Sequence, residues 1–448
     1  MSKVLWLSDG GSHTGFARVT HSIGERLVRD YGHEIHVLAI NHLGDDYPSI
    51  LDSTQKTPLW LYRPNTLRGD DVFGNSRILE MLGKVEPDVV VMLQDSHMIL
   101  AQIFDNQYDP QRYLLQMAPI LAYVPVDGYN LPPQWTTVLP AIVGKLVTMS
   151  GFGKKTFPTS ELVPHGVDTD TFWPVSDERP ITVSTGHELR SKRECKRAFG
   201  LDEDSFLVLR VDSNSGRKDY ASAVNALIPV MAEFPDIHAW FHCDPYKGTA
   251  STNIPSLLSR YEDKVKSDRF HFPDMFTSFI GWSDSDLNAL YNAADVFLST
   301  SRGEGFGLTL AEAAMAGLPI IAQNVSAIPE TVGPGAVLVE PDRFLTIPSG
   351  EDVALSDVGA FSEALRKLYQ SAGMRRDLGE AGKKHVLESF SWDEATQKFD
   401  EFIKELAVRE RPADSGSERV EDATDDHDGR PPVSTVQDPV GDTEGSNG

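Results

Sequence analysis

Cysteine is scarce in this chain of 448 residues, which contains only Cys195 and Cys243. Two cysteines provide no disulfide framework and fit the reducing cytoplasm. Long apolar runs are missing too: no stretch of 18 apolar residues occurs, and the apolar run near the N-terminus, Val4–Leu7, has four residues. We therefore expect a cytoplasmic protein without a transmembrane helix or a signal peptide.

Basic residues are in deficit. The chain has 41 Lys and Arg against 66 Asp and Glu, a net charge of -25. This balance gives no strong signal for nucleic acid or an anionic membrane as a partner. Residues 409–448 hold 11 acidic and four basic residues and no Leu, Ile, Phe, Trp or Tyr, so we expect a disordered acidic tail.

The usual metal and nucleophile motifs are also lacking. The Cys and His residues show no zinc spacing, and no Ser nucleophile elbow is present. The pairs Asp45-Asp46 and Asp70-Asp71 do not follow predicted strands. We expect neither a metal site nor a bound cofactor.

The sequence opens with an alternating pattern of strands and helices. A strand at 4–7 runs into the glycine-rich loop Ser8–Gly15, then a helix, then a strand at 35–40. This order is typical of a nucleotide-binding βαβ unit. Further strands, apolar on both faces as in parallel sheets, are predicted at 89–93, 120–124 and 145–149.

A second alternating series follows an irregular, proline-flanked segment at 164–174 and a charged helix predicted at 188–199. It predicts strands at 206–210, 237–242, 279–281, 296–299, 320–322 and 337–339, with helices such as 220–234 and 284–293 between them. We expect an α/β protein of two doubly wound Rossmann-like domains facing a central cleft. The predicted parts are an N-terminal domain (1–170), a linker with a connecting helix (171–200), a C-terminal domain (201–388), a final helix (389–408) and the tail (409–448).

The segment Ser301–Ala322 carries the strongest functional signal. It reads as a loop, a helix and a buried strand, with three glycines in the loop and the carboxylates Glu304 and Glu312 eight positions apart. Bare backbone amides at a helix N-terminus attract phosphate, and carboxylates accept hydrogen bonds from sugar hydroxyls. The pattern favours a bound nucleotide sugar. Gly-x-Gly loops before helices are common, however, and Glu312 could also be an ordinary solvated residue.

Three cations lie at the start of the second domain. Arg210 ends a predicted strand, and Arg217 and Lys218 precede a helix. Ligands of doubly wound sheets bind at the carboxyl ends of strands, where cations could neutralise a diphosphate and its developing charge. The alternative is a surface turn with solvated charges.

Candidate residues of the first domain also follow strands. Asp127 could bind a sugar hydroxyl, stabilise positive charge at a sugar carbon, or simply cap a turn. Among the histidines, His13 and His165 rank above His97 because their loops contain glycine.

Together these segments resemble a GT-B glycosyltransferase of glycosyltransferase family 4 over residues 1–406. The resemblance is carried by Glu304–Glu312, Tyr291–Ser301, Ile328–Glu330, His165–Phe172 and Phe390–Trp392. Two segments, Thr14–Thr20 and Pro125–Gly128, look most like a branch found in phages and archaea. The resemblance implies a final helix that crosses back onto the N-terminal domain.

It also implies roles for individual residues. Arg210 and Lys218, with Arg217 beside them, would bind the donor diphosphate, Glu304 the sugar hydroxyls and Glu312 the ribose. The remaining donor-binding candidates are Gly305, Phe306, Gly307 and Leu308, with Gly11 or Gly15 from the first domain. Arg210, Lys218, Glu304 and Asp127 are the catalytic candidates, and His13 and His165 the candidate sugar contacts. The chain departs from the family where a histidine motif usually follows the strand, and Asp127 would take part of that role.

The resemblance thus implies a metal-independent, retaining hexosyltransferase that uses a nucleoside diphosphate sugar as co-substrate. The acceptor is left open between a protein, a glycan and a small metabolite, with a virion protein or modified base added if the chain is encoded by a phage. The alternatives are a catalytically silent nucleotide-sugar-binding partner subunit, a GT-B epimerase, and a phosphorylase, for which no supporting lysine motif for pyridoxal is seen. The sequence does not indicate an oligomeric state.

Overall fold

The structure is a computed structural model that describes residues 1–11, 14–42, 58–64, 71, 73–104, 118–246, 252–273 and 281–408. His13 and the acidic tail at 409–448, both subjects of predictions above, lie outside the described residues.

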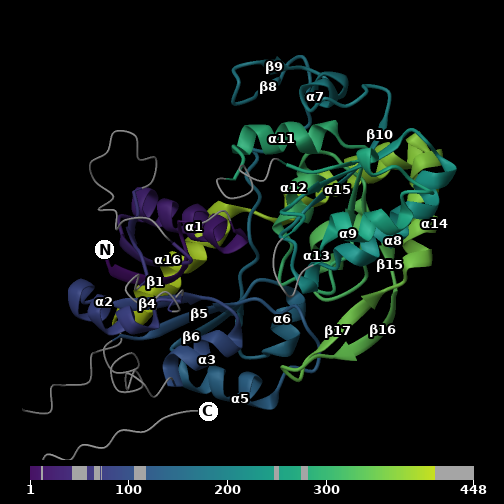
Figure 1. The fold of residues 1–448 in the computed structure, drawn as a ribbon. Helices are drawn as coiled ribbons and strands as arrows, with labels where there is room; N and C mark the ends of the chain where they lie inside the picture. The colour runs from purple at the N-terminus through teal and green to yellow at the C-terminus, as the bar shows by residue number, and fades with distance from the viewer. Residues whose placement is uncertain are drawn as a thin grey trace, which may run out of the picture. The chain divides into compact units, whose positions relative to one another are not determined.

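The N-lobe is built on a seven-stranded sheet in which all neighbouring strands are parallel. Its order is β3-β2-β1-β4-β5-β6-β7. The strands are β1 (Lys3–Asp9), β2 (Glu34–Ile40), β3 (Trp60–Tyr62), β4 (Val89–Leu93), β5 (Ile120–Val124), β6 (Lys145–Thr148) and β7 (Glu161–Leu162). The helices of this lobe include α1 (Gly15–Tyr31), α2 (Ile78–Val85), α3 (Ser96–Phe104), α5 (Pro133–Ile142) and α6 (Gly151–Thr156) (Figure 1).

The C-lobe repeats this architecture on a six-stranded parallel sheet of order β12-β11-β10-β13-β14-β15. Its strands are β10 (Phe206–Val211), β11 (Ile237–His242), β12 (Phe270–His271), β13 (Val296–Ser299), β14 (Ile320–Gln323) and β15 (Ala336–Val339). Its helices include α8 (Tyr220–Glu233), α9 (Ile254–Leu258), α11 (Asp284–Ala293), α12 (Leu308–Met315), α13 (Ile328–Val332), α14 (Val358–Gln370) and α15 (Ala372–Ser389). The prediction of two doubly wound sheets is confirmed.

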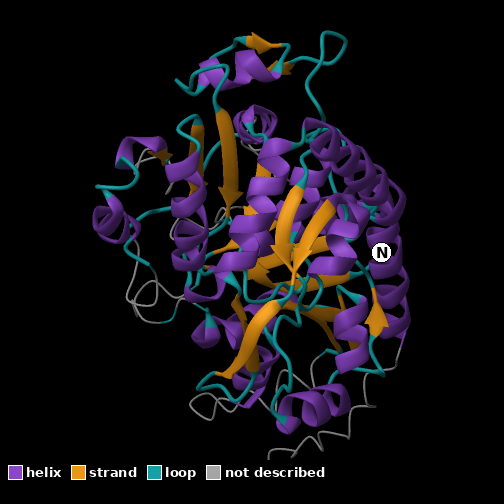
Figure 2. Cartoon of the chain, turned by 90° about the vertical axis from the view of Figure 1, so that its right-hand side faces the viewer, coloured by secondary structure: helices purple, strands orange, loops and turns teal. Residues whose placement is uncertain are grey.

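The central strands are apolar on both faces because helices cover both faces of each sheet (Figure 2). Every residue of β4 and of β5 is buried. Buried parallel strands of this kind leave only their ends and the loops beyond them available for polar chemistry. This is why the loops after β4, β5, β10 and β13 carry the candidate site.

Two local predictions differ from the structure. The helix predicted at 188–199 begins only at Lys192, as α7 (Lys192–Ala198), because the Ser191 hydroxyl caps it by accepting from the Glu194 amide at 3.3 Å. Residues Glu188–Leu189 instead form β9, which pairs with β8 (Ile181–Thr182). Most of the strand predicted at 279–281 lies outside the described residues, and β12 forms the described edge of the sheet.

The final helix, α16 (Trp392–Val408), packs on the N-lobe, as expected. Phe399 stacks on Trp6 at 5.7 Å between ring centroids. Polar contacts add to this: Asp400 Oδ1 lies 2.9 Å from His33 Nε2, and Lys145 Nζ lies 2.6 Å from Glu405 Oε2. In Figure 1, α16 (yellow) lies beside α1 (purple), although the two helices are far apart in sequence.

An antiparallel hairpin of the C-lobe, β16 (Pro341–Thr346) with β17 (Asp352–Ser356), was not predicted. It reaches the N-lobe near α5 and α6 (Figure 1). The backbones of Tyr129 and Asp352 exchange two hydrogen bonds of 2.8 Å, and the Tyr129 ring lies 5.0 Å from the Phe344 ring. The Tyr129 hydroxyl also accepts from the Ser326 amide at 2.8 Å, so Tyr129 joins the lobes at two places.

Among the described residues, no helix is long and apolar enough to cross a membrane.

Candidate active site

The site lies where the carboxyl ends of the two sheets face each other. The loop after β5 brings Pro125 and Asp127, and the loops after β10 and β13 bring Lys218 and Glu304. In doubly wound sheets this edge holds the ligand because strand ends and helix N-termini converge there. The lobes touch directly at this point.

Glycine is required in the Ser301–Gly307 loop because the loop packs against the N-lobe backbone. A Cβ atom on Gly303 would overlap the carbonyl oxygen of Asp127, and one on Gly305 would overlap Pro125. Gly307 has a φ of 97°, in the left-handed region that favours glycine. The glycines of the motif therefore permit close approach of the two lobes as well as exposure of backbone amides.

Arg217 joins the lobes through its guanidinium group. Its Nε lies 3.1 Å from Asp127 Oδ2, and its Nη1 lies 3.0 Å from Glu304 Oε2 and also donates to the Gly303 carbonyl oxygen. The planar guanidinium suits this double contact, because its donors point in fixed directions. Three sequence candidates, Arg217, Asp127 and Glu304, are thus brought together.

Lys218 lies on the C-lobe side of this cluster. Its ammonium nitrogen is 2.5 Å from Glu304 Oε1 and 2.7 Å from Asp212 Oδ1. Burial opposes the charge of Glu304, but Lys218 and Arg217 outweigh it and lower the pKa of the Glu304 carboxyl to about 2. Glu304 is therefore an anion throughout the physiological pH range, as an acceptor of hydroxyl hydrogen bonds must be.

Arg210 does not face the cleft, which corrects the prediction that it contacts the diphosphate. Its side chain is fully buried, and its guanidinium donates to Thr300 Oγ1 at 2.5 Å and to the Lys218 carbonyl oxygen. The Tyr220 ring lies 4.2 Å from the guanidinium carbon. Because these contacts use the guanidinium inside the lobe, Arg210 holds the loop of Lys218 in place and is a positioning residue.

Helix α12 begins directly after Gly307, and no side chain caps its N-terminus. Its first-turn amides keep the partial positive charge that attracts phosphate. The side chain of Leu308 lies 3.7 Å from the position of a Cβ atom on Gly15, where α1 begins. The N-termini of α1 and α12, one from each lobe, therefore approach each other. Gly11 lies earlier in the loop and packs on His42. A Cβ atom on Gly11 would overlap the His42 ring.

Glu312, one turn into α12, is buried and partnered by both lobes. It accepts from the Tyr291 hydroxyl at 2.8 Å, and its Oε1 lies 3.3 Å from Arg18 Nε of the N-lobe. Burial raises the pKa of the Glu312 carboxyl, against the opposing effect of the Arg18 cation. Arg18, which also pairs with Asp284 at 2.6 Å, was missed by sequence reasoning because helical arginines are usually solvated.

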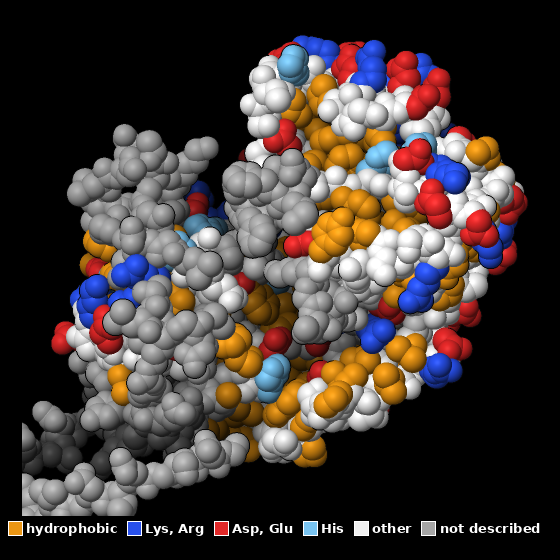
Figure 3. Space-filling view, viewed as in Figure 1, with side chains coloured by type: hydrophobic (Ala, Val, Ile, Leu, Met, Phe, Trp, Pro, Cys, Tyr) orange, Lys and Arg blue, Asp and Glu red, His pale blue; other side chains and the backbone are white. Residues whose placement is uncertain are grey.

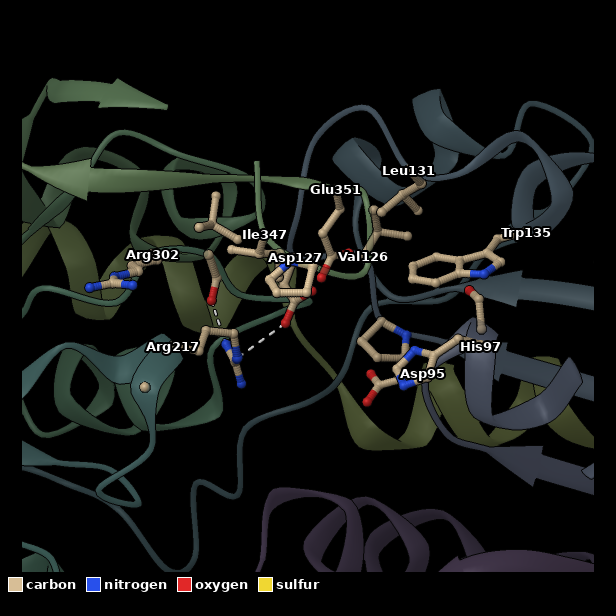
Figure 4. A pocket seen from close by; sticks show the side chains of 16 residues that line it. Asp95, His97, Val126, Asp127, Leu131, Trp135, Arg217, Arg302, Ile347 and Glu351 are labelled. Carbon is tan, nitrogen blue, oxygen red and sulfur yellow. Dashed lines mark hydrogen bonds and ion pairs between the residues drawn. The ribbon is translucent and has the colours of Figure 1, made fainter. Parts of the chain in front are cut away.

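A cavity of about 450 Å³ opens beside the Arg217–Asp127 pair. Figure 3 shows a hollow between the lobes where hydrophobic, acidic and histidine side chains gather. Figure 4 shows the walls of the cavity: Asp127 and Arg217 on one side, His97 and Trp135 on the other, with Asp95 and Glu351 between them. The His97 ring stacks on Trp135 at 5.2 Å.

Of the two ranked histidines that the structure describes, the lower-ranked His97 is the one at the cavity. His97 lines the cavity, whereas His165 is buried among Tyr123, Phe306 and Trp392, so its prediction as a sugar contact is corrected. Burial lowers the pKa of His165 to about 3, which makes it a neutral core residue. Asp95 and His97 could have been found from sequence, because they follow the buried strand β4.

Comparison with known proteins agrees with the fold and the motif. Residues 274–385 match the family model described as "Glycosyl transferases group 1". The chain is 26% identical over 233 residues to the O-antigen chain mannosyltransferase B of Escherichia coli, covering 46% of this chain and 56% of the relative. It is 27% identical over 252 residues to a GDP-mannose-dependent monoacylated alpha-(1-6)-phosphatidylinositol monomannoside mannosyltransferase of Corynebacterium glutamicum. This match covers 54% of this chain and 55% of the relative. The chain thus spans about half the length of these curated relatives.

Solved structures share the fold over nearly the whole length. The sucrose-phosphate synthase of Thermosynechococcus elongatus superposes with a TM-score of 0.65 at 16% identity, covering 91% of this chain and 99% of that one. The HepE protein of Anabaena in complex with UDP-glucose superposes with a TM-score of 0.63 at 14% identity, covering 91% and 100%.

The two facing sheets and the returning helix define a GT-B fold. Within it, residues 274–385 are similar to the glycosyl transferases group 1 family.

Proposed function

We propose that the protein is a glycosyltransferase that moves a sugar from a nucleoside diphosphate sugar to an acceptor hydroxyl, with retention of anomeric configuration and without a metal ion. The observation that carries this proposal is the order of side chains along the cleft. Glu312 of α12 pairs with Arg18 of α1, and the N-termini of these two helices approach each other. Glu304, in the loop before α12, pairs with Lys218, and Arg217 joins Glu304 to Asp127 at the edge of the cavity.

This order matches the parts of a donor laid end to end. The ribose would lie on Glu312, and the diphosphate against the uncapped N-terminus of α12, near Gly15 of the N-lobe. The transferred sugar would lie at Glu304 and Asp127, whose carboxylates accept hydrogen bonds from hydroxyls. The acceptor would enter from the cavity beyond Asp127.

In the transfer, the bond between the anomeric carbon and the diphosphate oxygen breaks, and a bond from that carbon to the acceptor oxygen forms. The diphosphate gains negative charge, which Lys218 and the amides of α12 stabilise. The negative charge of Asp127 stabilises the positive charge that develops on the anomeric carbon of the sugar. The acceptor hydroxyl loses its proton, and the departing diphosphate on the same face assists its removal.

The names of relatives suggest where to begin. The matched protein of Corynebacterium glutamicum is named as GDP-mannose-dependent, and that of Escherichia coli as a mannosyltransferase. The Anabaena structure contains UDP-glucose. We therefore choose GDP-mannose and UDP-glucose as the first donors to test.

The test is to incubate the full chain with each donor and follow nucleotide release, with the anomeric configuration of any product assigned by NMR. Nucleotide release with transfer of the sugar supports the proposal. Tight donor binding without release favours a silent partner subunit, and a changed sugar that stays attached to the nucleotide favours an epimerase. A product of inverted configuration refutes the retaining mechanism.

A further inference from the structure

We propose that the cavity beside Asp127 is an acceptor subsite selective for a hydroxylated ring that bears a protonated amino group, an amino sugar. This inference rests on the proposed function and specifies its acceptor. It is carried by a cavity that combines an aromatic wall with two carboxylates, Asp95 and Glu351, that form no ion pair within the described part of the chain.

The aromatic wall is formed by the stacked rings of Trp135 and His97, which belong to different elements, α5 and α3. Leu131 and Val126 extend its apolar surface (Figure 4). An aromatic face of this kind packs against the C–H groups of a sugar ring and also attracts an ammonium group through its electron-rich face. The volume of about 450 Å³ is within the range of small-molecule sites.

The carboxylates of Asp95 and Glu351 face this wall (Figure 4). Among the described residues, neither forms an ion pair, and the contact to Glu351 is a 3.3 Å hydrogen bond from the Ser349 hydroxyl. Burial, and next the nearby charge of Asp127, raise the pKa of both carboxyls. A cation placed between them would relieve this repulsion, whereas an anionic acceptor would increase it.

The cations that line the cavity are already engaged. Arg217 is held by Asp127 and Glu304, and Arg302 Nε lies 3.2 Å from Asp219 Oδ2. Neither guanidinium forms an ion pair with Asp95 or Glu351 among the described residues, although the charge of Arg217 and that of a protonated His97 partly offset the rise in the pKa of Asp95. The cavity has negative charge to offer to a ligand: Asp95 lies beside His97, and Glu351 lies between the aromatic wall and Asp127 (Figure 4).

Another part of the cavity lining comes from the β16–β17 hairpin. Ile347, Pro348 and Glu351 at its tip line the cavity, and the Tyr129–Asp352 bridge fixes the hairpin to the N-lobe. The subsite is therefore assembled from both lobes. The C-lobe selects the acceptor through Glu351 as well as binding the donor.

The experiment measures binding of matched methyl glucosides by saturation-transfer NMR and calorimetry, with the full chain. The 2-amino and 6-amino glucosides carry a charge, whereas methyl glucoside and the N-acetylated 2-amino compound do not. We expect at least one amine to bind about ten-fold or more tightly than both neutral compounds, as for hydrogen bonds to charged groups. Asp95→Asn, Glu351→Gln and Trp135→Ala should each abolish the preference, whereas the exposed Glu380→Gln should preserve it.

The same variants are tested for binding of GDP and UDP, which should be retained because the nucleotide is assigned to Glu312 and the N-terminus of α12. Equal binding of charged and neutral glucosides, no binding of either amine, or a preference that survives Asp95→Asn and Glu351→Gln would overturn the inference. Failure of the wild-type chain to bind either nucleotide or release it from any donor would instead refute the proposed function. The two failures are thus distinguishable.

Discussion

Arg217 Nε of the C-lobe lies 3.1 Å from Asp127 Oδ2 of the N-lobe, and the same guanidinium binds Glu304. One side chain therefore links the carboxylates assigned to the two sides of the transferred sugar. A sugar that enters between Glu304 and Asp127 must replace part of this contact. The ion pair thus couples occupation of the sugar position to the distance between the lobes.

Lys218→Ala is expected to lower kcat about 10² to 10³-fold, the effect of removing one donor that stabilises transition-state charge. Donor affinity should change little, because Lys218 acts chiefly on the leaving diphosphate. Steady-state kinetics and nucleotide titration separate the two effects. The substitution also removes one of the two cations paired with Glu304 and one of the two paired with Asp212, so thermal unfolding is measured alongside.

Lys218→Arg keeps the positive charge and therefore controls for a loss of stability caused by removing the buried cation. Lys264→Ala, at an exposed position, should have wild-type kinetics. Wild-type turnover in a folded Lys218→Ala enzyme would contradict the assignment of Lys218 to the diphosphate.

Glu312→Ala should weaken donor binding about ten-fold or more, because a buried carboxylate loses its hydrogen bonds to the ribose. Tyr291→Phe should have a smaller effect in the same direction, since it removes the 2.8 Å hydrogen bond that orients Glu312. Calorimetric titration with GDP and UDP measures both. An unchanged affinity in Glu312→Ala would exclude the ribose assignment.

Gly303→Ala should force the lobes apart. The new Cβ atom would overlap the backbone carbonyl oxygen of Asp127, which cannot move away by a change of rotamer. We expect a larger radius of gyration in small-angle X-ray scattering and a loss of turnover on the order of 10²-fold, as for a misplaced reacting group. Gly83→Ala is the matched control, because that glycine lies in α2 with open space around it. Equal scattering curves for the two variants would refute the close approach.

The two alternating domains and the position of the site could be predicted because they depend on local patterns. Apolar runs such as Val89–Leu93 and Ile237–His242 favour buried strands, and Glu304 and Glu312 were singled out by their spacing around a helix N-terminus. The final helix was expected from the sequence, whereas its crossing onto the N-lobe was implied by the family resemblance. In the structure the Ser391 hydroxyl accepts from the Glu394 amide at 3.3 Å at the start of α16.

Side-chain direction could not be predicted in the same way. Arg210 ends a strand, as expected, but the chain pattern does not say that its guanidinium turns into the lobe toward Thr300. Contacts between lobes are also invisible locally. Glu351 belongs to a segment with no motif, and the Thr14–Thr20 segment does not indicate that Arg18 pairs with Glu312; only the tertiary fold brings these side chains to the cleft.

His165 gives a prediction about stability rather than catalysis. Burial lowers its pKa to about 3, and among the described residues neither ring nitrogen has a hydrogen-bond partner. Between about pH 6.5, the usual histidine pKa, and about pH 3, the unfolded chain binds a proton at this position and the folded chain does not. The free energy of unfolding should therefore fall by about 1.4 kcal/mol per pH unit from this residue as the pH drops through that range.

His165→Phe keeps a ring among Tyr123, Phe306 and Trp392 and removes the titrating group. The slope of the unfolding free energy against pH is measured by urea titrations between pH 6.5 and 4. It should decrease by about 1.4 kcal/mol per pH unit in this variant, even if the change in packing alters the absolute stability. His187→Gln, at an exposed position, should leave the slope as in the wild type. An unchanged slope in His165→Phe would mean that the ring is hydrated or hydrogen-bonded in solution, which would return His165 to the candidates for ligand contact.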